Sequence, residues 1–339
     1  MKNLETSYMG LRLSSPVILG ASELSSHTDM LKKAEEQGAA AIVYKSLFEE
    51  QIQMENLYHD EKINQYNDIH AEMVTLHPDI DRSDIEYYLI KLRKVKESLS
   101  IPVIASLNCV NETSWFRYAK MIEETGVDGI ELNLYQIPVN FDLDATAIEQ
   151  HQADIVAAVK QQLSIPVSVK LSSDYTNILH FAKRLDEKGI DGMVLFNAFF
   201  QPDVDIWHEH HRKAFNLTSK GEFKQSLRYT GMLYGRIKAD ICSSRGIQDG
   251  ADVVKLLLTG ASCVQVVSAV YKHGIERIGV FNREISEWME KKQYNSINEF
   301  RGKLSDSVLN KNNTLLIYKR AQYIDLLLHS DTVLENLEW

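Results

Sequence analysis

Cysteine is scarce in this chain of 339 residues, which contains only Cys109, Cys242 and Cys263, well separated in the sequence. An odd number of separated cysteines argues against a disulfide framework, and no cysteine cluster is present for zinc or an iron–sulfur centre. No apolar run approaches the roughly 18 residues needed to span a bilayer. The start, MKNLETSYMG, lacks the apolar stretch of a signal peptide. We therefore expect a cytoplasmic protein with free thiols and no membrane association.

Basic residues are also fewer than acidic ones. The chain has 37 Lys and Arg residues and 47 Asp and Glu residues, which gives a net charge of −10. An acidic surface repels phosphate backbones, so we expect no nucleic-acid partner. The rest of the composition, with 44% hydrophobic and 25% charged residues, is that of an ordinary globular protein. We find no low-complexity linker, and α/β barrels of comparable length fold as one domain.

A local pattern repeats along the chain, in which a helix-like segment ends in Gly and a short apolar run follows. Examples are EEQGAAAIVYKS (35–46), EETGVDGIELN (123–133), DEKGIDGMVLFN (186–197) and LLTGASCVQVVS (257–268). Gly at this point is typical of a helix C-cap, and the run after it is typical of a buried parallel strand. The apolar runs predict eight strands, at residues 16–21, 41–45, 102–108, 129–134, 166–171, 192–197, 239–243 and 263–267.

Helix-like segments separate these runs, at residues 28–37, 83–98, 113–125, 147–163, 176–188, 225–237 and 248–259, with an eighth starting near residue 275. Alternating β and α units predict a parallel α/β sheet, and eight of them predict a closed (β/α)8 TIM barrel; a doubly wound open sheet is the alternative. We expect the barrel to occupy residues 1–280 and a C-terminal helical extension, residues 281–339, to pack on it or on a second subunit. The long stretches 46–82 and 198–224 are expected to build the active site or its lid.

Polar side chains follow the predicted strands, at the ends that carry function in this fold. Lys45 and Lys170 are the most informative, because each stands among apolar neighbours where an ammonium group needs an anion or dense hydrogen bonding. The two lysines suit a ligand with delocalised negative charge, such as a reduced isoalloxazine. The full set at the strand ends is Ala21, Ser22, Lys45, Ser46, Asn108, Asn133, Lys170, Asn197, Ser244, Arg245, Gly246 and Ser268.

The last two strands offer a candidate phosphate site. The loop SSRGI (243–247) leads into a predicted helix, and Ser268 ends the eighth strand. Barrel enzymes commonly bind phosphate with these two loops, through backbone N–H groups, and Arg245 would add a charge-assisted hydrogen bond. Because the loop has one glycine and no glycine-rich run, an ordinary turn is the alternative.

Several segments resemble motifs of the class 1 dihydroorotate dehydrogenase family. The long segments RGIQDGADVVKLLLTGASCVQVVSAVYKHG (245–274) and YNSINEFRGKL (294–304) are the most specific, and YKS (44–46), ELNL (131–134), VSVKL (167–171) and FNA (196–198) are shorter. The resemblance implies an FMN-dependent oxidoreductase of pyrimidine biosynthesis, which transfers a hydride from dihydroorotate to the flavin and yields orotate. It also implies a homodimer.

The resemblance assigns roles residue by residue. Ala21 and Ser22 would lie along the flavin, and Lys170 would stabilise its N1–C2 edge. Gly246 and Ser268 would meet its phosphate. The residues implied to contact flavin or substrate are Lys45, Ser46, Asn108, Asn133 and Asn197.

The chain departs from the family where the catalytic base is expected. The family continues after strand four as Asn-Leu-Ser-Cys-Pro-Asn, and its Cys, or Ser in other classes, removes the C5 proton; here the segment reads NLYQIP (133–138). Tyr135, which needs strong activation to act as a base, and Cys109 are the substitutes, together with water. Cys109 is more typical of a small buried core residue. Lys45 and Asn133 complete the predicted catalytic set.

Other departures leave the substrate open. Glu23 stands where the family usually has Gly, and Arg245 and Val267 replace phosphate-loop glycines. The stretch IHAEMVTLHP (69–78) lacks the family's substrate-loop glycine, although its His70 and His77 could supply acid–base groups. The alternatives are therefore an FMN enzyme of the same barrel acting on another small substrate, or a degenerate barrel without catalysis.

A histidine-rich segment, HEHHRK (208–213), lies in the second long stretch. The spacing of His208, His210 and His211 would suit a chelating site on a flexible loop. We expect a solvated polar segment there and no metal in the active site.

Overall fold

Eight parallel strands form a closed barrel in the computed structural model, which describes residues 2–49, 84–109, 111–198, 202–212, 217–309 and 328. The barrel closes where β12 pairs with β3 through Val264 and Val17. Each predicted strand corresponds to one strand of the barrel, so the (β/α)8 fold is confirmed and the open-sheet alternative is wrong. The strands are β3 (Val17–Leu19), β4 (Ile42–Phe48), β5 (Val103–Asn108), β6 (Gly129–Asn133), β7 (Val167–Leu171), β8 (Gly192–Leu195), β11 (Asp240–Ser244) and β12 (Cys263–Val266).

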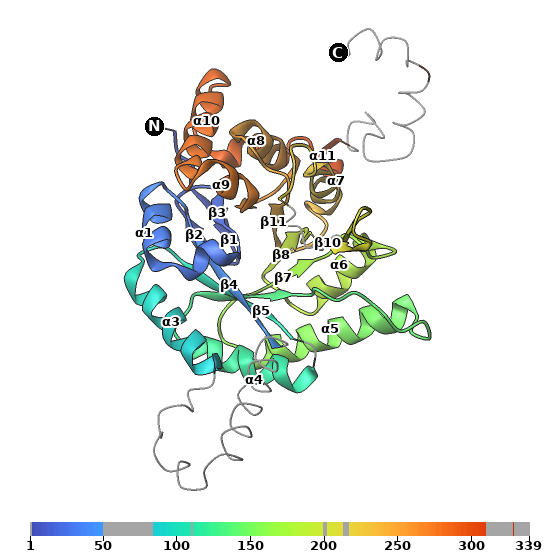
Figure 1. Cartoon of the computed structure of the whole chain (residues 1–339). Helices are drawn as coiled ribbons and strands as arrows, with labels where there is room; N and C mark the ends of the chain where they lie inside the picture. Colours follow the sequence, from blue (N-terminus) through green and yellow to red (C-terminus); the bar gives the residue numbers. More distant parts are fainter. Residues whose placement is uncertain are drawn as a thin grey trace, which may run out of the picture.

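Helices alternate with the strands and surround the barrel (Figure 1). Their ends follow the sequence signals, since Asp144, Asn177 and Asp249 each accept a backbone N–H of the first helical turn. The helices are α1 (Thr28–Glu36), α3 (Asp84–Ser98), α4 (Glu112–Glu123), α5 (Ala145–Gln162), α6 (Ile178–Glu187), α7 (Lys224–Leu233), α8 (Gly250–Thr259), α9 (Ser268–His273), α10 (Arg277–Lys291) and α11 (Asp306–Leu309), with 3-10 turns at Glu23–Ser26 and Ile297–Glu299.

The repeated Gly has the predicted role in the helix ends. Gly38, Gly126, Gly189 and Gly260 have φ angles of 84, 84, 82 and 121°. L-residues with side chains rarely adopt this region, so glycine ends each helix at low cost and releases the chain into the following strand.

A short N-terminal hairpin, β1 (Thr6–Tyr8) and β2 (Leu11–Leu13), closes the N-terminal end of the barrel. Tyr8 and Met9 are buried and lie against Gly192 and Gly129, where an added Cβ would come within 3.1 Å of them. Three-residue strands are too short to give a periodic signal, so the sequence did not predict this hairpin. With that end filled, the C-terminal ends of the strands form the accessible mouth.

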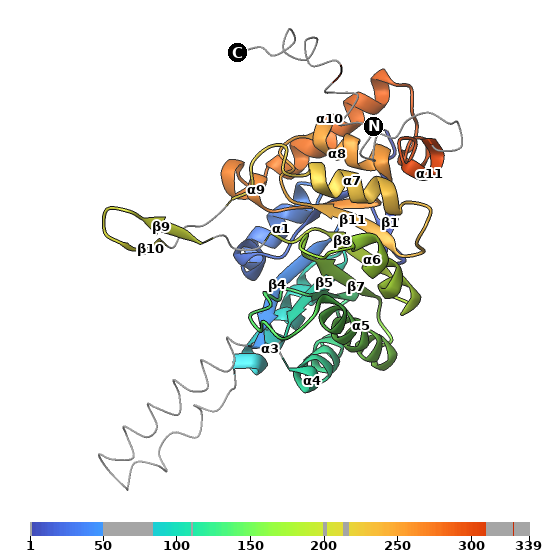
Figure 2. The ribbon, with the colours of Figure 1, turned by 90° about the vertical axis from the view of Figure 1, so that its right-hand side faces the viewer.

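A second hairpin, β9 (Asp203–Asp205) and β10 (His210–Arg212), follows β8 and projects from the body of the barrel (Figure 2). It occupies part of the stretch expected to be a long loop, 198–224. Most of the other stretch, with His70 and His77, lies outside the described residues, as does nearly all of the chain after residue 309.

The described start of the predicted C-terminal extension packs on the barrel helices. α10 contacts α8, and Phe281, Ile285 and Met289 on α10 are buried. Trp288, Tyr294 and Phe300 pack ring against ring beside them, with centroids 4.9 to 5.7 Å apart. Among the described residues, no helix is both long enough and apolar enough to cross a membrane.

Candidate active site

Three asparagines are joined by hydrogen bonds at the mouth of the barrel. Asn108 and Asn133 are the last residues of β5 and β6, and Asn197 follows β8. Asn108 Nδ2 donates to the backbone carbonyl oxygen of Asn133 over 2.7 Å, and Asn197 Nδ2 donates to Asn133 Oδ1 over 2.9 Å. The hydrogen bond from Asn197 therefore orients the side-chain amide of Asn133 before any ligand binds, and Asn108 binds the backbone of the same residue.

A buried network lies beside them, built on β6, β7 and β12. Lys170 Nζ donates to Gln265 Oε1 over 3.1 Å, and Gln265 Nε2 donates to Glu131 Oε2 over 2.5 Å. Lys170 Nζ also lies 3.8 Å from Glu131 Oε1, a buried oxygen that has no hydrogen-bond partner among the described residues. The Lys170 charge is thus compensated inside the protein by Glu131, although its side chain is only 10% exposed.

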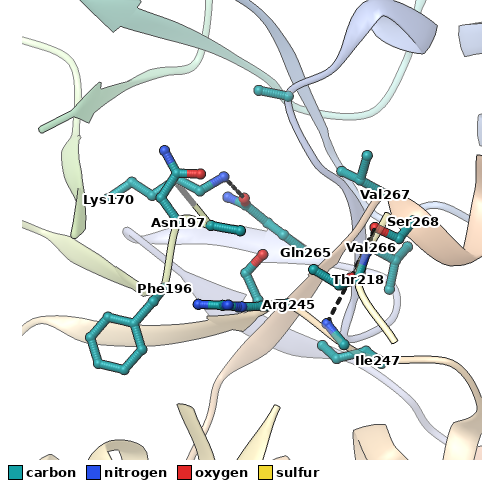
Figure 3. A pocket seen from close by; sticks show the side chains of 14 residues that line it. Lys170, Phe196, Asn197, Thr218, Arg245, Ile247, Gln265, Val266, Val267 and Ser268 are labelled. Atoms are coloured by element: carbon teal, nitrogen blue, oxygen red, sulfur yellow. Dashed lines mark hydrogen bonds between the residues drawn. The ribbon is translucent and has the colours of Figure 1, made fainter. Parts of the chain in front are cut away.

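A cavity of about 150 Å³ opens at the mouth, between β7, β8, β11 and β12 (Figure 3). Seven of the twelve predicted cofactor residues line it: Ala21, Lys170, Asn197, Ser244, Arg245, Gly246 and Ser268. Thr218, Phe196, Ala198, Ile247, Gln265, Val266 and Val267 complete the wall. More than half of the residues predicted for the cofactor therefore lie around one cavity.

Thr218 stands among the predicted phosphate-binding groups. Its Oγ1 accepts a hydrogen bond from Gly246 N over 3.1 Å and donates to Ser268 Oγ over 2.9 Å, and its own N–H donates to Ser268 Oγ over 3.0 Å. Its carbonyl oxygen accepts from Lys272 Nζ over 2.7 Å and from Gln248 Nε2 over 3.1 Å. Thr218 thus occupies the Gly246 N–H, one of the donors expected to hold a phosphate, whereas Ser268 Oγ is the acceptor in both of its hydrogen bonds with Thr218.

Backbone shape at this end of the cavity requires glycine. Gly246 has φ +69°, and an added Cβ would lie 2.7 Å from Phe223 N. Gly20, at the end of β3, would place a Cβ 2.8 Å from Val267 Cγ2. The β-branched Val267, expected to disturb the phosphate loop, is therefore accommodated over a glycine. Arg245, with φ +80°, turns its Nε to Glu222 Oε2 over 3.1 Å.

Lys45 and Ser46 lie where β4 departs from regular pairing. The register of β4 against β5 shifts between Tyr44 and Leu47, so the two residues form a bulge, a feature that redirects side chains near active sites. Lys45 Nζ donates to Glu23 Oε2 over 2.8 Å, and Ser46 Oγ is 2.7 Å from Ser106 Oγ.

A second hydrogen bond holds the Glu23 carboxylate beside Lys45. Its Oε1 accepts a hydrogen bond from Ser26 Oγ over 2.7 Å, and the hydrogen bonds from Lys45 and Ser26 lower the pKa of Glu23 below its usual range. The charge of Lys45 is therefore matched within the protein by a residue that stands where the family usually has glycine.

The two candidate bases lie apart from the cavity lining. Tyr135 follows β6, and its N–H donates to the Asn133 carbonyl over 2.8 Å. Cys109 is buried in the hydrophobic core that surrounds the barrel. Neither side chain lines the cavity.

Ser22, another predicted cofactor residue, precedes the 3-10 turn that carries Glu23.

Four residues of this site were missed or given no role by sequence reasoning. Glu131 and Gln265 are polar residues inside the apolar strands GIELN (129–133) and CVQV (263–266), which was the available signal. Glu23 was noted only as a departure from the family. Thr218 had no signal, because it lies 28 residues before Gly246, the loop residue to which it is hydrogen-bonded.

The cavity lies at the mouth of a (β/α)8 barrel, beside the loops after its last two strands, which is the common position of the phosphate site in barrel enzymes. A family model for dihydroorotate dehydrogenase matches residues 73–289. The chain belongs to this family, whose enzymes are flavin-dependent oxidoreductases acting on a CH–CH bond.

Relatives of known name span nearly the whole chain. It is 29% identical over 307 residues to the catalytic subunit of dihydroorotate dehydrogenase B (NAD(+)) from Thermoplasma acidophilum, covering 89% of this chain and 99% of that protein. The subunit of the same name from Thermoplasma volcanium is 27% identical over 306 residues, covering 89% and 98%. The one from Methanocaldococcus jannaschii is 27% identical over 283 residues, covering 80% and 89%.

Proposed function

We propose that this protein binds FMN in the cavity at the barrel mouth and oxidises dihydroorotate to orotate, a reaction of pyrimidine biosynthesis. The observation that carries the proposal is the convergence of Lys170, Arg245 and Gly246 on one cavity, together with four other predicted cofactor residues. These groups fit an anionic, phosphorylated ligand: cations at the wall, and a glycine that allows close approach of backbone N–H.

The residues divide between cofactor and substrate. FMN, when bound, supplies the acceptor for a hydride from substrate carbon. Lys170 stabilises negative charge at the ring, because its ammonium group lines the cavity and is held by Gln265. Asn133 and Asn197 orient the substrate amide with a geometry fixed by their mutual hydrogen bond, and Asn108 holds the Asn133 carbonyl.

Proton removal from substrate carbon is the step with the weakest protein support. Cys109 is buried in the core and the Tyr135 side chain is not part of the cavity wall, so neither is presented to a ligand in the cavity. We therefore assign the C5 proton to solvent water at the mouth, with Tyr135 as the protein group to test. A thiol or hydroxyl in the family's position is replaced by Gln136.

One observation favours a substrate other than dihydroorotate. It is the ion pair between Lys45 and Glu23, whose charged atoms lie 2.8 Å apart. A substrate carboxylate that reached Lys45 would have to share its charge with Glu23, which weakens binding of an anion such as dihydroorotate. An FMN oxidation of a neutral or cationic compound is the corresponding alternative.

We also propose a cytoplasmic homodimer. All three cysteines are buried and form no disulfide within the described residues, which suits a reducing compartment. Large apolar side chains are exposed on the loop after β6, at Ile137, Val139, Phe141 and Leu143, and exposed apolar patches are typical of subunit interfaces.

The deciding experiment follows the visible absorption of the purified protein, loaded with FMN and titrated anaerobically with dihydroorotate. Bleaching of the flavin band supports dihydroorotate as the substrate. A flavin band that persists overturns dihydroorotate but keeps the flavin site, and failure to retain FMN overturns the site itself. Reoxidation by fumarate, NAD⁺ or oxygen then identifies the electron acceptor.

A further inference from the structure

The hairpin that projects beside the barrel mouth gathers three potential metal ligands at its tip. Asp205 is the last residue of β9, His208 lies in the turn, and His210 is the first residue of β10. One ligand atom from each residue lies within 4.8 Å of the corresponding atoms of the other two. The hairpin extends into solvent, away from the barrel (Figure 2), so an ion can reach the cluster without a change in the fold.

The pairing of the strands explains why these residues meet. Asp205 and His210 are directly opposite each other in the antiparallel ladder, so their side chains stand on the same face of the hairpin. His208 is three residues beyond Asp205, and its ring centroid is 5.8 Å from that of His210. His211 is paired with Val204 instead and therefore points to the other face.

Asp205 is held in place by hydrogen bonds within the turn. Its Oδ1 accepts the backbone N–H groups of Trp207 over 2.9 Å and of His208 over 3.1 Å, and its Oδ2 lies 3.0 Å from His208 Nδ1. The carboxylate therefore has one oxygen that anchors the turn and one that lies beside the His208 ring.

We propose that Asp205, His208 and His210 bind a divalent transition-metal ion, with Zn²⁺ as the ion of best match. Two imidazoles and one carboxylate suit Zn²⁺, Co²⁺, Ni²⁺ or Cu²⁺, whereas Mg²⁺ and Ca²⁺ prefer all-oxygen sites. Tetrahedral Zn²⁺ with bonds of about 2.0–2.1 Å needs its ligand atoms about 3.3 Å apart. Rotation of the exposed His208 and His210 side chains closes the remaining gap.

Three protein ligands leave the fourth position of a tetrahedral ion open to water or to a group from another molecule. The hairpin follows β8 and thus belongs to the connections at the mouth of the barrel, outside the cavity lining. The site is therefore separate from the flavin cavity and requires no part of the proposed reaction.

The test measures metal binding to the full chain without a polyhistidine tag, by titration calorimetry with Zn²⁺ and by the visible absorption of bound Co²⁺. Trp207, 86% exposed between the ligands, gives a local fluorescence signal that Cu²⁺ quenches, and Trp207→Phe removes that signal. Each of His208→Ala, His210→Ala and Asp205→Asn is expected to weaken Zn²⁺ binding at least about tenfold, since even outer-shell substitutions cost that much. Asp205→Asn keeps the oxygen that anchors the turn.

His211→Ala is the matched control, because it removes a neighbouring imidazole from the opposite face of the same strand. Its Zn²⁺ affinity is expected to equal that of the wild type, and Mg²⁺ and Ca²⁺ are expected not to compete. Circular dichroism checks that all variants keep the fold. The proposal is overturned if no single equivalent of Zn²⁺ binds, or if His211→Ala weakens binding as much as His208→Ala.

Discussion

Glu23 controls the charge available at Lys45, because its carboxylate forms a 2.8 Å ion pair with that ammonium group. Glu23→Gln removes the negative charge while keeping the shape, so we expect the KM for an anionic substrate such as dihydroorotate to fall by up to about fivefold, the equivalent of an exposed ion pair. The kcat is expected to change less, since Glu23 does not line the cavity. An unchanged or higher KM would contradict this role.

The pH dependence of that effect has a defined sign. Lys45 lowers the pKa of Glu23, so the carboxylate stays charged until the pH falls through this lowered value. The KM difference between Glu23→Gln and wild type should therefore be constant around neutral pH and shrink only in acid. The ion pair stabilises the fold above the unfolded pKa of Glu23 and loses that contribution on acidification, but its 61% exposed carboxylate keeps the contribution small.

The pairing of Lys170 with Glu131 makes a different prediction, on stability. Lys170→Met leaves the 1% exposed Glu131 carboxylate without its cation, and breaking such a buried pair costs about 3–5 kcal/mol in unfolding free energy. Lys170→Met combined with Glu131→Gln should be clearly more stable than Lys170→Met alone, because the uncompensated charge is gone. Urea unfolding of Lys170→Met, of Glu131→Gln and of the double variant measures these free energies. Simple additivity of the two single effects would refute the coupling.

At this scale the sequence predicted which residues approach the mouth, because polar side chains at the ends of apolar strands must gather at one edge of a parallel sheet. It did not predict their partners. Lys170 was expected to face an anionic ligand, yet Glu131 and Gln265, from two other strands, already compensate its charge. Partner choice depends on the strand register, which a single sequence does not reveal.

Among the elements, the segment around Thr218 contacts both residues proposed to bind the FMN phosphate. Its hydroxyl engages Gly246 N and Ser268 Oγ, the same groups proposed for the FMN phosphate. Thr218→Val keeps the side-chain volume and removes this competition, leaving the Gly246 N–H unpaired until phosphate binds. We expect FMN affinity to rise about two- to tenfold, from a net hydrogen-bond contribution of about 0.5–1.5 kcal/mol.

Riboflavin provides the matched ligand control for this substitution, since it has the same ring system without the phosphate. Its affinity should be equal for wild type and Thr218→Val, measured by quenching of flavin fluorescence. Weaker FMN binding by the variant would show instead that the Thr218 hydroxyl is itself a phosphate ligand. A parallel change for both flavins would place the effect at the ring and not at the phosphate.

Elements were predicted well where burial on both faces produced a continuous apolar run, as in β5 and β7. The hairpins β1–β2 and β9–β10 were missed because three-residue strands carry too few side chains for a period to emerge. The bulge at Lys45 was missed for the same reason, since one shifted pair leaves no trace in hydrophobicity. The bulge positions Lys45, the partner of Glu23, and the β9–β10 hairpin positions the proposed metal ligands.

For the molecule as a whole, the proposed dimer depends on the exposed loop after β6. Val139 and Phe141 are 84% and fully exposed, an arrangement that leaves apolar area in water unless a second subunit covers it. Sedimentation velocity should find a dimer for the wild type and a monomer for Val139→Asp combined with Phe141→Asp, because two buried carboxylates at an interface are strongly unfavourable.

Trp207→Asp is the control, because it places the same charge at another highly exposed apolar residue, on the β9–β10 hairpin. If the dimer uses the β6 loop, this variant stays dimeric. A wild type that sediments as a monomer would refute the homodimer. A double variant that remains dimeric would instead move the interface away from Val139 and Phe141. Since the barrel has its own closed core, the monomeric variant is expected to keep its fold and its FMN affinity, which separates loss of assembly from loss of structure.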